Sequence, residues 1–447
     1  MLRPTSVTAP PTRVRFGVPH FAIALAIISY IDRVCISWSM PNIRATFGLV
    51  GAAHDDAVGW IFSAFTFAYA LFEMPTGWLG DRFGPRKTLV RVVLWWSLFT
   101  AATGWTWSFG SLIAVRFLFG IGEAGCFPNL TRAFSIWLRP EEKVRGQSIL
   151  WLGARWGGAF TPLLVAGVLA VVSWRVSFSI FSSLGILWSF FFYRWFRDDP
   201  GEHPAVNEAE RALLAGNPPV ARHGTVPWTR FLSSRTTWWL LWAQYFFFSY
   251  CWYFYITWLP QFLKDSYGVA HGMVFLAMLA GIPLLGGGFG NLVAGRVVPG
   301  LAARLGDVRS ARRVLPLTGC ALAGLMFVFL AQHLNQPVVV MGAMGLASFF
   351  GDLTMPSAWG ACMDVGGTFS GTYSGSMNMM GNLGGAVGPI VVGYLLKTTG
   401  QNWGLIYDVS AGALFLAAVC WIFIDPVTSL APIEAARVEP SRGAVMV

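Results

Sequence analysis

The chain has 447 residues, of which 55% are hydrophobic and only 12% carry a charge. A soluble domain carries about 25% charged residues, so this composition excludes an ordinary soluble protein and favours a polytopic helical membrane protein. The net charge of +10 does not indicate a nucleic-acid partner, because the basic residues are scattered over short segments between long apolar runs. Continuous apolar runs also exclude a transmembrane β-barrel, whose strands are segments of about ten alternating residues.

Twelve apolar spans, each long enough to cross a bilayer, are predicted along the chain. They lie at residues 18–46, 57–79, 87–107, 109–138, 146–172, 174–196, 236–263, 271–299, 313–333, 336–363, 369–397 and 402–424. The longest interruption, residues 197–235, is charged and rich in proline and divides the spans six and six. Within it, Asn207 and Glu210 predict a capping box for a short helix that ends at Leu214.

The spans predict an all-α membrane protein with twelve transmembrane helices in two six-helix pseudo-repeats. The expected regions are an N-terminal tail (1–17), an N-terminal bundle (18–196), a linker (197–235), a C-terminal bundle (236–424) and a C-terminal tail (425–447). Lys and Arg are concentrated in the tails, the linker and alternate loops, which predicts that both termini are cytoplasmic in a cell (inner or plasma) membrane. A single chain of this kind completes a pathway, so a functional monomer is expected.

The two halves contain similar motifs at matching positions. The fifth span has GGAFTP at 157–162 and the eleventh has GGAVGP at 384–389, while the first has WSMPNI at 38–43 and the seventh has WLPQFL at 258–263. Such a parallel repeat predicts a substrate site between the halves, near the middle of the bilayer.

Charged residues inside the spans are concentrated in the first half. Asp32 and Arg33 lie in the first span, Arg116 and Glu123 in the fourth, and Arg155 in the fifth. Charges inside a membrane are costly, so they are expected to face a cavity and to pair. With both acids ionised, this half has one surplus positive charge, which an organic anion could neutralise, since a guanidinium binds a carboxylate through two parallel hydrogen bonds.

The second half is rich in polar and aromatic residues instead. Trp359 in the tenth span and Asn378 in the eleventh are candidates for contacts with hydroxyl groups of the substrate. Asp352 in the tenth span could bind a hydroxyl group or take up a proton, and the sequence leaves these two roles open.

The segment after the second span reads GWLGDRFGPRK, residues 77–87, and resembles the signature loop of the major facilitator superfamily. Asp81 and Arg82 are expected to pair with charges or helix ends of a neighbouring loop and so to hold the cytoplasmic side shut. The residues predicted to form this gate are Glu73, Gly77, Asp81, Arg82, Gly84 and Arg86. The corresponding segment after the eighth span has Gly295 in place of the acidic residue, which predicts fewer closing contacts there.

Five further motifs resemble the anion:cation symporter branch, which includes bacterial glucarate, galactonate and phthalate carriers and animal sialic-acid carriers. They are YIDR (30–33), RFLFGIGEA (116–124), WLGARWGGAFTP (151–162), YFYITWLP (253–260) and GTYSGSMNMMGNLGGAVGP (371–389). The resemblance implies proton-coupled uptake of an organic anion, with Asp32 and Glu123 as the protonatable pair. It also implies substrate-side or coupling positions for Arg33, Tyr69, Arg116 and Asn378.

Together these features predict a secondary transporter that moves a sugar acid with protons by alternating access. An anion exchanger, a uniporter and a carrier for an aromatic acid remain alternatives, and the direction of transport is open. No enzyme is expected, because the sequence lacks a serine-nucleophile motif and a phosphate loop, and its six histidines lack metal-ligand spacing. The expected partners are therefore a small organic anion, protons and the bilayer, without a metal, a cofactor or a nucleic acid.

Overall fold

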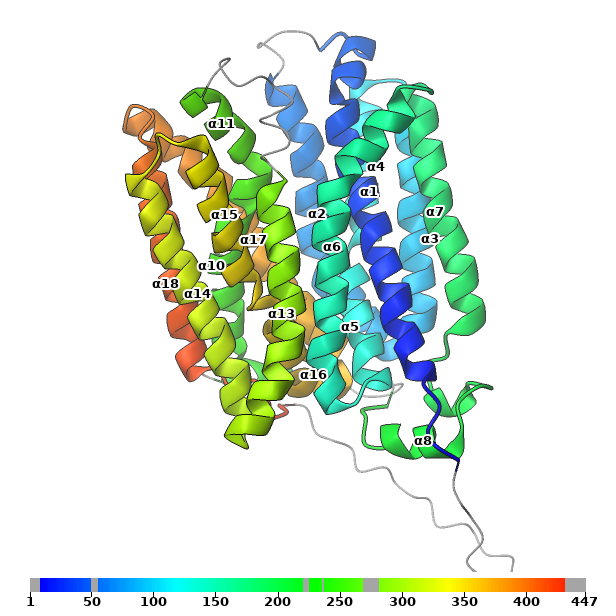
Figure 1. Cartoon of the computed structure of the whole chain (residues 1–447). Coiled ribbons are helices and arrows are strands. Elements are labelled where there is room, and N and C mark those ends of the chain that lie inside the picture. Colours follow the sequence, from blue (N-terminus) through cyan, green and yellow to red (C-terminus); the bar gives the residue numbers. More distant parts are fainter. Residues whose placement is uncertain (1–8, 50–54, 220–224, 235–236, 268–280, 431–447) are drawn as a thin grey trace, which may run out of the picture.

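The computed structural model describes residues 9–49, 55–219, 225–234, 237–267 and 281–430. Within these ranges the chain is helical and contains no strand, which confirms the predicted all-α class (Figure 1). Seven helical segments of the described residues are long and apolar enough to cross a membrane. Large apolar side chains such as Leu163 and Ile390 point outward from the helices, as expected for surfaces that face lipid.

Each predicted span coincides with one helix or with two consecutive helices, although residues 271–280 lie outside the described ranges. The first six spans form η1 (Val14–Phe16), α1 (Gly17–Thr46), α2 (Asp55–Phe83), α3 (Pro85–Gly104), α4 (Phe109–Glu123), α5 (Cys126–Trp137), α6 (Pro140–Leu169) and α7 (Trp174–Trp195). The last six form α10 (Thr237–Thr257), α11 (Leu259–Tyr267), α13 (Ile282–Leu305), α14 (Val308–Gln332), α15 (Pro337–Asp352), α16 (Met355–Gly366), η5 (Gly367–Phe369), α17 (Ser370–Thr398) and α18 (Trp403–Phe423).

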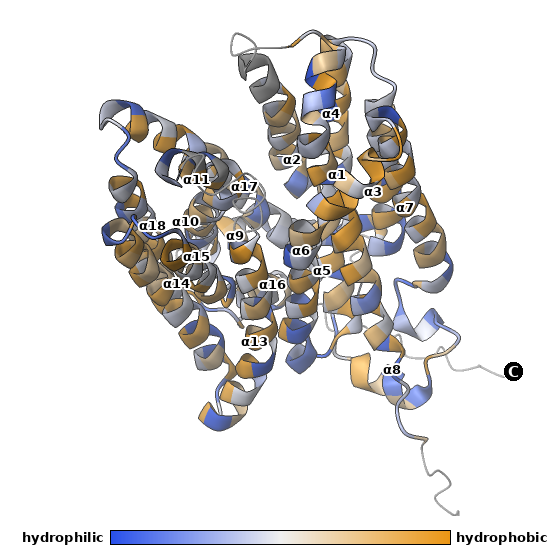
Figure 2. Cartoon of the chain, turned by 45° about the horizontal axis from the view of Figure 1, so that its top comes forward, coloured by the Kyte–Doolittle hydropathy of each residue, from blue (hydrophilic) through white to orange (hydrophobic). Residues whose placement is uncertain are grey.

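The helices form two groups that pack against each other through several helix pairs. Helices α1, α3, α4 and α7 lie on one side of the molecule, and α10, α11, α14 and α18 lie on the other (Figures 1 and 2). Between them, α2 packs against α17 and α6 packs against α13. We call α1–α7 the first half and α10–α18 the second half.

The fourth and tenth spans are each interrupted, where the sequence predicts continuous helices. In the fourth span, α4 ends at Glu123, and Gly125 then adopts a φ of 83°, which glycine tolerates better than other residues. In the tenth span, α15 ends at Asp352, and α16 begins at Met355 after two intervening residues, with Pro356 in its first turn. Broken helices are tolerated at membrane depth only where protein or a cavity covers the freed backbone groups.

The signature segment is helix rather than the predicted loop. Helix α2 continues through Asp81 and Arg82 to Phe83, and only Gly84, with a φ of 87°, separates it from α3. Pro85 is the first residue of α3, where its missing N–H would have no helical partner anyway. The carboxylate of Asp81 is therefore held on a rigid helix end.

The linker contains η3 (Pro200–Glu202), α8 (Glu208–Leu214) and α9 (Trp228–Ser233). Asn207 caps α8 as predicted, by accepting a hydrogen bond from Glu210 N at 2.9 Å. The second bond of the expected capping box is replaced, because the Glu210 carboxylate instead accepts hydrogen bonds from Thr12, Val14 and Arg15. The start of the described chain therefore lies against α8 (Figure 1), and we call this end of the molecule the α8 end.

Both halves hold part of the linker. On the first half, Asn217 Nδ2 donates to Ile136 O at 2.8 Å and to Leu138 O at 3.1 Å. On the second half, the Phe231 ring of α9 stacks on Trp238 and meets Tyr373 edge-on, with both centroids 5.2 Å away.

Candidate functional site

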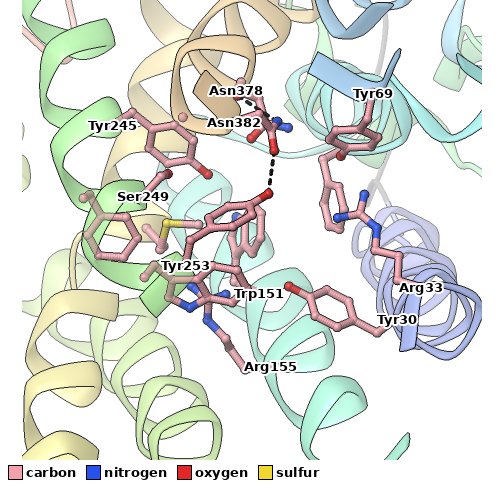
Figure 3. A pocket seen from close by; sticks show the side chains of 15 residues that line it. Tyr30, Arg33, Tyr69, Trp151, Arg155, Tyr245, Ser249, Tyr253, Asn378 and Asn382 are labelled. Carbon is pink, nitrogen blue, oxygen red and sulfur yellow. Dashed lines mark hydrogen bonds between the residues drawn. The ribbon is translucent and has the colours of Figure 1, made fainter. Parts of the chain in front are cut away.

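A cavity of about 50 Å³ lies between the two halves, at the level of the helix breaks (Figure 3). Its lining is aromatic and polar, with two arginines. The lining residues are Tyr30, Arg33, Tyr69, Phe127, Trp151, Arg155, Tyr245, Phe248, Ser249, Trp252, Tyr253, Met355, Asn378, Gly381 and Asn382. Aromatic walls with a few convergent polar groups are typical of small-molecule sites.

Arg33 of α1 borders the cavity from the first half. Its Nε donates to Glu123 Oε1 at 2.7 Å, and its guanidinium lies over the Tyr69 ring at 4.4 Å. Ser29 Oγ donates to the same oxygen of Glu123 at 2.5 Å. Nη2 of Arg33 is buried without a hydrogen-bond partner. The Arg33 guanidinium therefore keeps donor capacity free while it neutralises Glu123.

Arg155 of α6 borders the cavity from another side (Figure 3). Its Nε and Nη2 donate to the two carboxylate oxygens of Asp352 at 2.6 and 2.7 Å, which is a bidentate pair. Its guanidinium also lies over the Trp252 ring at 4.2 Å. Because Asp352 belongs to α15, this ion pair joins the two halves.

The second half contributes hydrogen-bonding groups to the cavity. Tyr253 OH donates to Asn382 Oδ1 at 2.8 Å (Figure 3). Asn378 Nδ2 donates to Glu73 Oε1 of α2 at 2.6 Å, so a second polar contact crosses between the halves. Glu73 is fully buried and its other oxygen lacks a hydrogen-bond partner.

Asp32 and Arg116 lie behind the cavity lining, inside the first half. Both side chains are buried, neither carboxylate oxygen of Asp32 has a hydrogen-bond partner, and the same holds for Nε and Nη1 of Arg116. The Arg116 guanidinium lies over Phe119 at 4.3 Å. Arg116 and Glu123 lie on one face of α4, as the sequence predicts. Glu123 nevertheless forms its ion pair with Arg33 and not with Arg116.

Of the predicted substrate residues, Arg33, Tyr69, Arg155 and Asn378 border the cavity. The others lie one layer behind it: Arg116, Asp352 and Trp359. Trp359 is fully buried, donates to Tyr245 OH at 3.1 Å and packs on Trp151. The sequence could not separate the two layers because helical spacing does not show which face meets the other half.

The predicted surplus of positive charge is not found. That prediction counted only the first half, whereas Asp352 of the second half neutralises Arg155 and Glu73 is buried at the same interface. Sequence analysis also missed Tyr30, Trp151 and Trp252. Trp151 lies one helical turn before Arg155 and Tyr30 begins the YIDR motif, so two of these three residues carried a usable signal.

At the α8 end, the signature residue Asp81 contacts the second half. Its carboxylate accepts hydrogen bonds from Gly371 N at 2.9 Å and from Thr372 N at 2.6 Å, and so binds the start of α17. A negative charge at a helix N-terminus is favourable. Gly77 of α2 lies so close to Gly371 that a methyl group on either would collide with the backbone of the other.

Of the other gate candidates, Glu73 bonds Asn378 of the second half, whereas Arg82, Gly84 and Arg86 stay within the first half or the linker. Arg82 is exposed beside Trp78, and Arg86 donates to Tyr193 O and, through its backbone N–H, to Asp198. A methyl group on Gly84 would collide with the Asp198 carboxylate. The buried Arg132 of α5, which sequence analysis missed, has its Nε 3.4 Å from Asp81 Oδ1.

The second half closes the α8 end through contacts of its own. Asp364 of α16 pairs with Lys143 of α6 at 2.7 Å and with Arg312 of α14. Near Gly295, Ser148 Oγ donates to Asn291 O at 2.7 Å, across the contact between α6 and α13. The acidic group therefore comes from α16 rather than from the degenerate signature segment.

Comparison with known proteins gives the family. The family described as the Major Facilitator Superfamily matches residues 22–389. The chain is 33% identical to the probable sulfoacetate transporter SauU of Cupriavidus necator, over 90% of this chain and 92% of that protein. It is 29% identical to the probable galactarate/D-glucarate transporter GudP of Escherichia coli K12, over 89% of this chain and 90% of that protein.

Solved structures share the fold. The proton:xylose symporter XylE aligns with a TM-score of 0.73 at 12% identity, over 93% of this chain and 97% of that one. The human organic anion transporter MFSD10 aligns with a TM-score of 0.72 at 15% identity, over 92% of this chain and 100% of that one. Among the described residues, no group of three or more His, Cys, Asp and Glu could hold a metal ion. The family match and the transporter relatives show that the chain is a twelve-helix membrane protein of the Major Facilitator Superfamily and a transporter rather than an enzyme.

Proposed function

We propose that this protein is a secondary transporter that moves a small organic anion together with protons through the cavity, by alternating access. It lies in the cytoplasmic membrane with the α8 end and both termini on the cytoplasmic side, where basic residues are concentrated. The relatives named for sulfoacetate and for galactarate and glucarate support an organic anion as cargo.

The balance of buried charge carries this proposal. The groups in and behind the cavity are Arg33, Arg116, Arg155, Asp32, Glu73, Glu123 and Asp352. With all of them ionised, three positive charges face four negative ones, so the empty site already has an excess negative charge. A further anion would be strongly disfavoured in this poorly solvated place unless carboxylates took up protons. Anion binding and protonation are therefore coupled by charge alone.

Glu123 is the first coupling group in this mechanism. An anion that binds the free side of the Arg33 guanidinium weakens the hold of Arg33 on Glu123, which then accepts a proton. Because the linkage is reciprocal, protonation of Glu123 also strengthens anion binding at Arg33. Asp32, which faces Arg116 without a hydrogen bond, is the second proton site of the predicted pair.

The cavity favours a short anion as cargo. Its volume of about 50 Å³ leaves room for few heavy atoms, and its two arginines suit a molecule with an acidic group at each end, such as sulfoacetate. A sugar acid is the second candidate, because Tyr253, Asn382 and Ser249 offer hydrogen bonds to hydroxyl groups on the opposite wall. An aromatic acid is also tested, because aromatic side chains line much of the cavity and could stack on its ring.

Asp81 holds the cytoplasmic side shut in this mechanism. Its two hydrogen bonds to the start of α17 break when the halves separate at the α8 end, and the contact between Gly77 and Gly371 opens with them. Arg132 and Asp364 support the same closed state from the neighbouring helices.

Proteoliposomes that hold the purified protein and a pH dye test the function. Sulfoacetate, D-glucarate, D-galactonate and an aromatic acid are added singly without an imposed gradient, and acidification of the lumen by one of them is expected. Glu123→Gln should still exchange labelled anion across the membrane but should acidify the lumen at least tenfold less. Exchange of labelled anion by the wild type without any acidification would instead identify an exchanger or a uniporter.

A further inference from the structure

The ion pair between Arg155 and Asp352 is a bidentate contact between the halves beside the cavity. Both carboxylate oxygens are bound, at 2.6 and 2.7 Å, and the two side chains are 2% and 1% exposed. Bidentate pairs of this kind are the strongest that a carboxylate forms with arginine. The two partners are placed differently: Arg155 borders the cavity, whereas Asp352 does not.

Arg155 can receive a second anion from the cavity side. Asp352 uses Nε and Nη2, which leaves the hydrogens of Nη1 for another acceptor. Trp252, whose ring lies 4.2 Å from the guanidinium carbon, fixes the plane of the guanidinium from one face. An anion in the cavity therefore meets the same cation that Asp352 holds from behind.

Space for a displaced carboxyl group lies behind the pair. A second cavity of about 20 Å³, roughly the room that one water molecule needs, borders Asp352 and Ser348 of α15. Apart from Ser348 and Tyr255, its walls are largely apolar, with Phe248, Phe327 and Leu414 among them. Such a place favours a neutral carboxylic acid over a carboxylate.

Gly287 of α13 keeps the carboxyl group of Asp352 free of steric contact. A methyl group at this position would collide with Asp352 Oδ2 and come 2.8 Å from Ser348 Oγ. The other titratable or charged groups that face Asp352 or its cavity are Arg155 from α6 and Tyr255 and Cys251 from α10. Within the part of the chain that the structure describes, Arg155 is thus the one cation facing Asp352, and Asp352 loses its partner if Arg155 turns to another anion.

We propose that Asp352 is the resident counter-ion of Arg155 and that the transported anion takes its place. The carboxylate of Asp352 leaves the guanidinium, accepts one proton and turns into the cavity behind α15, while the acidic group of the substrate pairs with Arg155. Each anion bound in this way takes up one proton at Asp352, beyond any taken up at Glu123. This inference rests on the proposed function, because it requires an anion in the main cavity.

Calorimetric titration of the purified full-length protein with sulfoacetate, and separately with D-glucarate, tests the exchange. Titrations in buffers of different ionisation enthalpy count the protons taken up per anion. Asp352→Asn has the shape of the neutral acid, so it should bind the anion at least tenfold more tightly at neutral pH and take up about one proton fewer than the wild type. Asp425→Asn, which removes a partly exposed carboxylate paired with Arg309 at the α8 end, is the matched control and should behave as the wild type.

A second variant tests the space rather than the charge, and it applies even if Asp352→Asn does not fold. Gly287→Ala crowds the carboxyl group in its paired position and should loosen the pair with Arg155, so it should tighten anion binding at least tenfold. Gly300→Ala on the same helix, where a methyl group meets no atom within 4 Å, should leave binding unchanged.

The outcomes separate the two proposals. An unchanged proton count in Asp352→Asn, or weaker anion binding by that variant, would overturn the exchange at Asp352 while the proposed function stands. If the wild type binds neither these anions nor the others of the transport panel, both proposals fail. If Asp352→Asn cannot be purified, unaltered binding by Gly287→Ala overturns the exchange.

Discussion

The breaks in the fourth and tenth helices resemble each other and differ in one respect. Each first segment ends in an acidic residue, Glu123 in α4 and Asp352 in α15, and a proline follows within the first turn of the second segment. Glu123 pairs with Arg33 of its own half, whereas Asp352 pairs with Arg155 of the other half. Equivalent positions of the repeat thus hold an internal ion pair in one half and a bridging ion pair in the other.

This difference determines what each pair can do when the halves move. An ion pair within one half can persist while that half rotates as a rigid body. An ion pair between the halves has to break or find a new partner whenever the halves separate at its level. We therefore expect the Arg33 pair to respond mainly to substrate and protons, and the Arg155 pair to respond also to the conformational change.

Removal of Arg155 should have the largest effect. Arg155→Gln leaves Asp352 buried without a positive partner, which costs about 3–5 kcal/mol for a buried pair. We expect a clear fall of the melting temperature in detergent and at least a 100-fold loss of transport. Arg309→Gln, which removes the cation of the exposed pair with Asp425, should change the melting temperature little. Equal losses in both variants would contradict a special role for the bridging pair.

Removal of Arg33 should be less destabilising although transport is lost. The Arg33 side chain is 20% exposed toward the cavity, and Glu123 keeps its hydrogen bond from Ser29. We expect Arg33→Gln to lower stability by about 1–3 kcal/mol. Melting curves of Arg33→Gln and Arg155→Gln in the same detergent compare the two pairs directly. A greater loss in Arg33→Gln would reverse the order that burial predicts.

The turns that follow the two acids should show the smallest effects. Gly125→Ala forces a side chain into the left-handed region and against Thr76, at about 1–2 kcal/mol for the backbone alone. Thr354→Ala in the other break removes a hydroxyl that lies 3.2 Å from Cys320 Sγ, at about 0.5–1.5 kcal/mol. Thermal unfolding of both variants measures the difference. A lower melting temperature for Thr354→Ala than for Gly125→Ala would show that the break in the tenth helix is the more constrained one.

The sequence predicts the helices, and it singles out two arginines that border the cavity. Long apolar runs define the helices, and the cost of a charge in a membrane marks Arg33 and Arg155 as candidates for a cavity. The partner of Arg155 could not be predicted, because Asp352 lies 197 positions further along and contact between halves leaves no periodic signal. The break after Asp352 was equally hidden, since Leu353 and Thr354 include no glycine and Pro356 is its one local sign.

The anchoring of the linker limits how far the two halves can move apart at the α8 end. Pro219 accepts a hydrogen bond from Arg132 of the first half, and α9, which begins at Trp228, packs on the second half. The eight residues between Pro219 and Trp228 are the part of the linker between these two anchors. Nine Cα–Cα steps separate Pro219 from Trp228, and a fully extended chain reaches at most about 3.6 Å per step, so these two residues can be at most about 32 Å apart. While both anchors hold, this part of the linker therefore sets an upper limit on how far the two halves can separate at the α8 end.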